Sequence, residues 1–198
     1  MANTNKGRKF PAEPLTEDEV RSLIRACSNR APSGIRNRAL LAVLYRCGLR
    51  CAEALSLSPK DVDAKTNQLR VLCGKGGKSR TVGIDDDALA VLDRWLDTRK
   101  RLGITSKVKP LFCTITASKD KSLKPGAAMK TDYVRQLLPR LKRKAGIERR
   151  VHAHAFRHTF VSKQMANGVS VPDIQRQLGH RPIDDTDTYF KSSQRRTT

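Results

Sequence analysis

Residues 68–84 read QLRVLCGKGGKSRTVGI, and this stretch decides the fold class. Apolar and polar residues alternate on both sides of a glycine-rich centre, which is the period of strands with one buried face. The centre itself, GKGGKS at 74–79, consists of residues that favour tight turns. The stretch therefore predicts an antiparallel β-hairpin, and no other part of the sequence indicates a sheet as clearly.

The sequence on either side of the hairpin has the period of helices. Thr16 and Glu19 have the spacing of a capping box, and Leu15 and Val20 that of a hydrophobic staple, so we expect a helix of about a dozen residues from there towards Cys27. Apolar spacing predicts further helices over about 36–47, 86–100, 131–144, 155–166 and 171–178, with Gly48, Gly103, Gly146 and Gly168 as stop signals. The fold class is therefore α+β, mainly α, with one small antiparallel sheet.

The organisation along the chain is simple. Residues 1–14 are polar and basic, so we expect a flexible basic arm ahead of a single domain over 15–198 that ends in a short C-terminal tail. A stretch at about 114–130 is rich in Lys, Ser and Gly and is expected to be a loop. A chain of 198 residues with 38% hydrophobic content suffices for one core.

The charge of the chain points to a polyanionic partner. Lys and Arg number 40 against 19 Asp and Glu, which gives a formal net charge of +21. Cationic side chains that neutralise phosphates release condensed counterions, so nucleic acid is the first choice. A ribosome-associated protein, a passive nucleoid binder or a membrane-surface protein would carry such a charge too. Charge alone therefore favours binding over catalysis.

The sequence also indicates where the chain works. It contains no apolar run near the roughly 20 residues that span a bilayer, and its start has no apolar signal segment, so we expect a cytoplasmic, nucleoid-associated protein without a membrane partner. Its five cysteines are scattered in apolar surroundings and are expected to be reduced. The pairs Cys47 with Cys51 and His154 with His158 are each four apart, but neither matches a common zinc motif, so we expect no metal.

Several polar residues carry weak signals one at a time. Arg50 just past a helix end is by default a solvated cation, and Lys75 between glycines a charged turn residue. Tyr189 is by default a packing aromatic, while His154 and His180 read as half-buried histidines. Their arrangement as a set carries more information than any one of them.

Five segments form that set: CGLRCAEALSL at 47–57, GKGGKSRTVGI at 74–84, HAHAFRHTF at 152–160, LGH at 178–180 and DTDTYF at 185–190. They occur in the order and spacing of the tyrosine recombinase or phage integrase family, which the chain resembles from Leu15 to Lys191. Arg50 and Glu53 match the family's G-h-R-x-x-E pattern, where h is hydrophobic. The resemblance places the family's six catalytic residues at Arg50, Lys75, His154, Arg157, His180 and Tyr189.

The resemblance implies a site-specific DNA recombinase that cuts and rejoins strands without a metal or other cofactor. Arg50 and Arg157 would clamp the scissile phosphate, because a guanidinium stays charged and its planar fork holds two oxygens at once. Tyr189 would attack the phosphorus and leave a 3′-phosphotyrosine, which retains the bond energy for rejoining. His154 would assist the transfer of the tyrosine proton, and Lys75 would protonate the departing 5′ oxygen.

The remaining assignments concern contacts with DNA. His180 would hydrogen-bond the scissile phosphate. Lys78 and Arg80, in the same hairpin as Lys75, are expected to splay outward on alternate faces and contact the DNA phosphates or a groove. The expected partner is double-stranded DNA. We expect a monomer in free solution and an oligomer on DNA, with the tetramer as the family's form.

Three alternatives stay open at this point. Most family members carry an additional N-terminal helical domain, whereas only fourteen residues precede Leu15, so the chain corresponds to the catalytic domain alone, either as a natural single-domain enzyme or as a fragment. A type IB topoisomerase would use a similar nucleophile and arginine clamp. A DNA-binding or architectural protein of the same fold, catalytically weak or inactive, is the non-enzymatic alternative. The DNA site and the outcome, whether integration, excision, inversion or resolution, are not encoded in these motifs.

Overall fold

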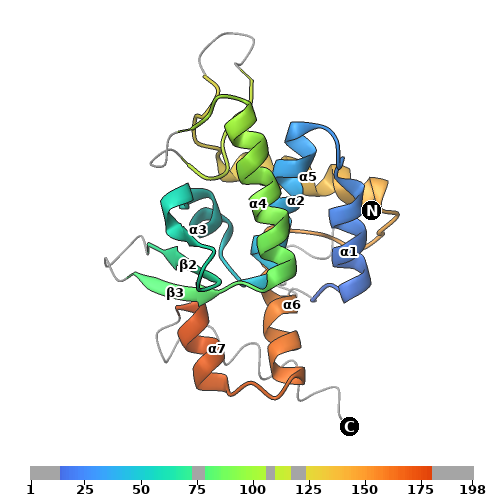
Figure 1. The fold of residues 1–198 in the computed structure, drawn as a ribbon. Coiled ribbons are helices and arrows are strands. Elements are labelled where there is room, and N and C mark those ends of the chain that lie inside the picture. The colour runs from blue at the N-terminus through green and yellow to red at the C-terminus, as the bar shows by residue number, and fades with distance from the viewer. Residues whose placement is uncertain (1–13, 73–78, 106–109, 117–123, 180–198) are drawn as a thin grey trace.

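The computed structural model describes residues 14–72, 79–105, 110–116 and 124–179 (Figure 1). The helices are α1 (Glu17–Ala26), α2 (Pro32–Arg46), α3 (Cys51–Ser56), the short 3-10 helix η1 (Pro59–Asp61), α4 (Asp86–Arg101), α5 (Thr131–Lys144), α6 (Ala153–Ala166) and α7 (Val171–Leu178). The strands are β1 (Val62–Asp63), β2 (Gln68–Val71) and β3 (Arg80–Gly83). A mainly helical α+β fold with a small antiparallel sheet is thus confirmed.

The predicted hairpin consists of β2 and β3, which pair antiparallel with Leu69 opposite Val82. The sequence did not indicate β1, which pairs with β2 through Val62 and Leu69 and makes a three-stranded sheet in the order β1-β2-β3. A strand of two residues is too short to show the alternation on which the prediction depends. Residues 73–78, which include Lys75 and Lys78, lie outside the described residues.

The helix predictions hold with small shifts in their ends. At α1 the capping box is present, since the Thr16 hydroxyl accepts a hydrogen bond from the Glu19 backbone and the Glu19 carboxylate accepts one from the Thr16 backbone. The helix α2 begins four residues before the expected start, because Pro32 fits the first helical turn, where its missing N–H is no loss. The helices α5 and α7 have the predicted bounds.

The core lies around α2, whose leucines Leu40, Leu41 and Leu44 are fully buried. This helix packs against α4, which contributes the buried Trp95, and against α6 (Figure 1). None of the helices in the described part of the chain has both the length and the apolarity needed to cross a membrane. The thiols of Cys27, Cys47 and Cys113 are free and buried, whereas Cys73 lies outside the described residues.

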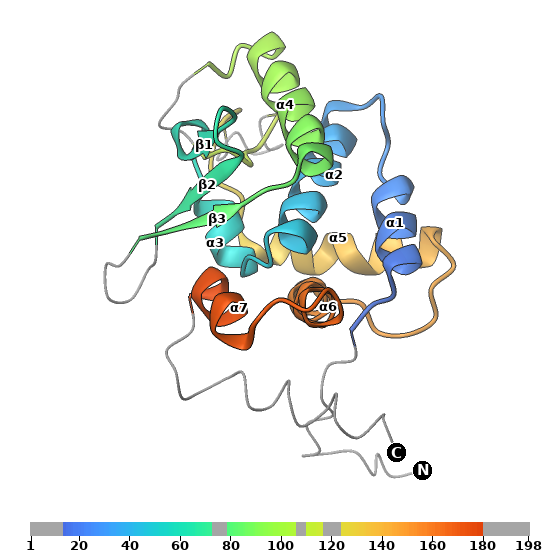
Figure 2. The same ribbon diagram turned by 60° about the horizontal axis from the view of Figure 1, so that its bottom comes forward.

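A second, smaller apolar cluster holds α7 to the rest of the fold. It consists of Phe160 and Val161 from α6 and Ile174 and Leu178 from α7. Figure 2 shows α6 and α7 side by side, beneath the layer formed by α2, α3 and α5. The chain between α2 and α3 passes directly against this cluster at Gly48.

Gly48 has a left-handed backbone with φ of 62°, and a Cβ added there would lie 2.6 Å from Cδ1 of Phe160 and 3.0 Å from Cδ2 of Leu178. Gly103 has a similar φ of 73°, but an added Cβ would meet nothing within 4 Å. We therefore predict that Gly48→Ala lowers the free energy of unfolding by about 2–4 kcal/mol, from backbone strain plus overpacking.

The matched control, Gly103→Ala, should lower the free energy of unfolding by only about 1 kcal/mol, since this variant adds backbone strain without overpacking. Urea denaturation of the two variants measures the difference. Equal losses would show that the close approach of Gly48 to the α6–α7 cluster does not constrain the fold.

Candidate active site

Four of the eight side chains that the sequence singled out lie in the described part of the chain. They are Arg50, Arg80, His154 and Arg157. The other four, Lys75, Lys78, His180 and Tyr189, lie outside the described residues, so their assignments stay predictions.

Arg50 stands at the N-terminal cap of α3, and its side chain is 41% exposed. Its position is held by Glu53, one turn further along the helix. The Glu53 carboxylate accepts a hydrogen bond from the backbone N–H of Arg50 at 2.8 Å and another from its Nη1 at 3.3 Å. A carboxylate in the first turn of a helix satisfies a backbone donor that has no intrahelical partner. The same carboxylate therefore caps α3 and holds the guanidinium of Arg50.

Arg157 lies in α6 and is fully buried. Its Nη1 donates a hydrogen bond to the carbonyl oxygen of Gly48 at 2.7 Å, and its Nη2 donates one to the carbonyl oxygen of Leu178 at 2.8 Å. Its Nη1 also lies 3.8 Å from the carboxylate of Glu53. One guanidinium thus links α6 to the loop before α3 and to the end of α7.

Arg80 does not have the outward orientation that the sequence predicted. Its side chain is only 10% exposed, and its Nη1 and Nη2 donate to the two carboxylate oxygens of Glu53 at 3.0 and 2.9 Å. The prediction is wrong, because Arg80 is on the same face of β3 as the buried Val82, two residues along the strand. The alternation that predicted the strand already placed Arg80 on its inner face.

Glu53 is the residue at which these contacts meet. Burial raises the pKa of its carboxyl, but the hydrogen bonds from Arg80 and from the Arg50 backbone, with the charges of Arg80 and Arg157, together hold the pKa below its ordinary value. Glu53 is therefore ionised at neutral pH. Three guanidinium groups around one carboxylate leave an excess of positive charge, and such a cluster attracts an anionic group.

Glu53 matches a family motif in the sequence, but the motif alone gave it no role of its own. One signal for that role was available. A carboxylate three residues after the residue that caps a helix fits the spacing of a capping interaction. Its contact with Arg80 joins residues 27 positions apart, and only the fold brings these together.

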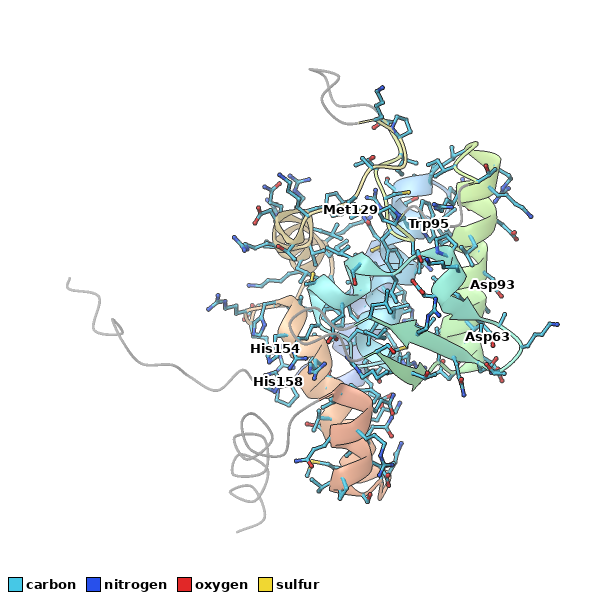
Figure 3. The ribbon with its side chains drawn as sticks, turned by 90° about the vertical axis from the view of Figure 1, so that its left-hand side faces the viewer. Asp63, Asp93, Trp95, Met129, His154 and His158 are labelled. Atoms are coloured by element: carbon cyan, nitrogen blue, oxygen red, sulfur yellow. The ribbon has the colours of Figure 1, made fainter. Side chains whose placement is uncertain are left out.

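His154 lies in the first turn of α6 with its side chain exposed, three residues before Arg157. Its ring meets that of His158 edge to face, with 4.8 Å between the ring centroids and 88° between the planes (Figure 3). Burial first, and then the neighbouring His154, His152 and Arg157, lower the pKa of His158 to about 4. His158 is therefore neutral at pH 7, and His154 is the exposed imidazole of the pair.

The pairs considered for zinc do not form a metal site among the described residues, where no three potential ligand side chains gather. Burial raises the pKa of the Cys47 thiol, and it raises that of Cys51 to about 11. Both thiols are therefore protonated at neutral pH.

Comparison with known proteins shows the family to which this chain belongs. Residues 13–196 match the model of the phage integrase family. The tyrosine recombinase XerC of Alcanivorax borkumensis is 33% identical over 184 residues, which cover 92% of this chain and 56% of the relative. The tyrosine recombinase XerA of Pyrococcus horikoshii is 33% identical over 189 residues, which cover 94% and 60%. The chain thus spans little more than half the length of these relatives.

Solved structures agree with the fold. A crystal structure of XerA recombinase matches 97% of this chain and 68% of that one, with a TM-score of 0.72 and 28% identity. A post-cleavage complex of the XerH site-specific recombinase with a palindromic difH substrate matches with a TM-score of 0.76, covering 98% of this chain and 53% of that one; at 24% identity it shows the fold alone. The match over residues 13–196 shows that this chain belongs to the phage integrase family of tyrosine recombinases.

Proposed function

We propose that this chain catalyses site-specific cleavage and rejoining of DNA strands through a 3′-phosphotyrosine intermediate on Tyr189, without a metal ion. The observation that carries the proposal is the joining of Arg50 and Arg157 at the Glu53 carboxylate. These are the two arginines that the family pattern assigns to the scissile phosphate. Relatives with 33% identity are named tyrosine recombinases.

The proposed reaction follows from the charges at this site. Attack on a phosphodiester concentrates negative charge on the non-bridging oxygens. The exposed guanidinium of Arg50 stabilises this charge, and the buried positive charge of Arg157 beside it adds to the stabilisation. Glu53 holds both groups before the substrate arrives, so little reorganisation is needed when the charge develops.

The proton transfers fall to other residues of the pattern. A tyrosine hydroxyl has a pKa near 10 and needs a partner that accepts its proton during the attack. The exposed imidazole of His154 is on the same helix as Arg157 and takes that role. Lys75 protonates the leaving 5′ oxygen, and His180 hydrogen-bonds the phosphate. The new P–O bond to Tyr189 replaces the broken P–O bond to the 5′ oxygen, so a 5′-hydroxyl can reverse the step.

We assign double-stranded DNA as the partner and the exposed face of α5 as part of its binding surface. That face carries three exposed arginines, Arg135, Arg140 and Arg143. Figure 2 shows α5 running from α3 towards α1 and past α6, so the helix that carries these arginines adjoins the elements of Arg50 and Arg157. Residues 1–14 add basic charge as an arm, and 15–198 form the catalytic domain.

Assembly on DNA completes the proposal. A lambda integrase tetramer bound to a Holliday junction shares the fold at 17% identity, with a TM-score of 0.62. We propose that this chain is a monomer in free solution and a tetramer on paired DNA sites.

The nucleophile is tested by covalent trapping. The purified protein is incubated in EDTA with a pool of nicked, randomised duplexes and run on a denaturing gel beside Tyr189→Phe. We expect an SDS-resistant protein–DNA band that the Tyr189→Phe variant lacks, because the phosphotyrosine bond needs the hydroxyl. A wild-type band that is absent while DNA binding is intact would contradict the proposal and favour the architectural alternative.

The binding surface is tested by salt dependence. Removing one cation that neutralises a phosphate lowers the slope of log Kd against log salt by about one, so the double variant Arg140→Gln with Arg143→Gln should lower the slope by roughly two. The control is Arg21→Gln with Arg176→Gln, which removes the same charge from exposed sites on α1 and α7. Fluorescence anisotropy measures both. Equal reductions of the slope would mean that the α5 face has no special part in binding.

A further inference from the structure

The helix α7 is held to the protein by a small apolar cluster. Only Ile174 and Leu178 of its eight residues are buried, and their cluster with Phe160 and Val161 is separate from the main core. The chain that leaves α7 passes through Gly179 and continues in the sequence to His180 and Tyr189. The position of the end of α7 therefore sets where that chain departs.

Two arginines hold this end. The last carbonyl groups of a helix have no intrahelical partner, and cations stabilise them. At the end of α7, the carbonyl oxygen of Gln177 accepts a hydrogen bond from Nε of Arg80 at 2.8 Å, and that of Leu178 accepts one from Nη2 of Arg157 at 2.8 Å. Arg80 comes from the hairpin and Arg157 from α6, so two distant segments meet at the same helix end.

Arg80 also packs closely on the residue that ends the helix. Gly179 has a left-handed backbone with φ of 65°. A Cβ added to Gly179 would lie 2.9 Å from Nη1 of Arg80 and 3.0 Å from its Cδ. The nearly buried guanidinium therefore fills the space beside Gly179 while its two Nη groups hold Glu53. These hydrogen bonds of Arg80 connect β3, α3 and the end of α7.

We propose that Arg80 is a positioning residue, which fixes the end of α7 to Glu53 and so sets the path of the chain towards His180 and Tyr189. This inference rests on the proposed function. Arg80 acts through Glu53 and the α7 carbonyl and touches no reacting atom. We assign Arg80 this role in place of the DNA contact expected from the sequence, because its side chain is only 10% exposed and donates hydrogen bonds to Gln177 and Glu53.

The fork of the guanidinium is essential to this role. Nε donates in one direction and the two Nη groups in another, so one rigid group spans the helix end and the carboxylate. A lysine keeps the charge but has a single ammonium group, which cannot hold both partners in that geometry. Arg80→Lys therefore separates the positioning role from the charge.

The first measurement is hydrogen–deuterium exchange in the full chain. We expect the amides of residues 174–179 to exchange at least tenfold faster in Arg80→Lys than in the wild type, with the amides of α2 unchanged. The control is Arg176→Lys, an exposed arginine on the same helix that forms an ion pair with Asp173 of its own turn, and it should leave exchange unchanged. Unchanged exchange in Arg80→Lys, or an equal acceleration in α2, would overturn the proposal.

The second measurement is covalent trapping on a nicked duplex, with the affinity for DNA measured separately. Arg80→Lys should trap at least tenfold more slowly, while its Kd and salt slope stay within twofold of the wild type. A weaker Kd with a lower salt slope and normal trapping at saturating DNA would show a DNA contact instead and overturn the proposal. If the wild type forms no covalent complex, the proposed function fails, and the exchange measurement still decides the role of Arg80.

Discussion

The nearly buried carboxylate of Glu53 is the constraint on which the rest of the site depends. Taking a charge out of water costs several kcal/mol, and hydrogen-bonded partners of opposite sign must offset that cost. Glu53 has Arg80 and Arg50 as hydrogen-bonded partners and Arg157 at 3.8 Å. Removing one member of such a group leaves another charge without its partner in the protein interior. This typically destabilises the folded state by about 3–5 kcal/mol. Glu53 and its arginine partners therefore hold one another in place, and each depends on the others for its stability in the fold.

The same contacts explain how separate parts of the fold become one site. Glu53 belongs to α3, Arg80 to the hairpin and Arg157 to α6, and the two arginines extend to the end of α7. The apolar cores could hold these elements at the correct distance without fixing their orientation, since apolar burial is non-directional. Directional hydrogen bonds between charged groups supply that orientation. Close approach at Gly48 then brings the α2–α3 loop against the α6–α7 cluster.

Sequence patterns predicted the parts of the fold that local periodicity controls. The hairpin, the capping box at Thr16 and the bounds of α5 and α7 all follow from spacing along the chain. The orientation of Arg80 was predicted wrongly, although its alternation with Val82 indicated the inner face. The role of Glu53 could be derived only in part: its spacing from Arg50 indicates a helix cap, but its contacts with Arg80 and Arg157 join residues up to 104 positions apart that only the tertiary fold brings together.

The ionisation of Glu53 is the most direct test of its central place in the site. Its carboxyl group can be followed by carbon-13 NMR in a pH titration of the folded protein. We expect a pKa below the ordinary value of 4.5, because the arginines outweigh the effect of burial. Since the folded pKa is then lower than the unfolded one, this stabilisation is present at neutral pH and is lost as the pH falls through the folded value. A Glu53 pKa above 4.5 would show that burial outweighs the arginines, and it would contradict a site organised by this carboxylate.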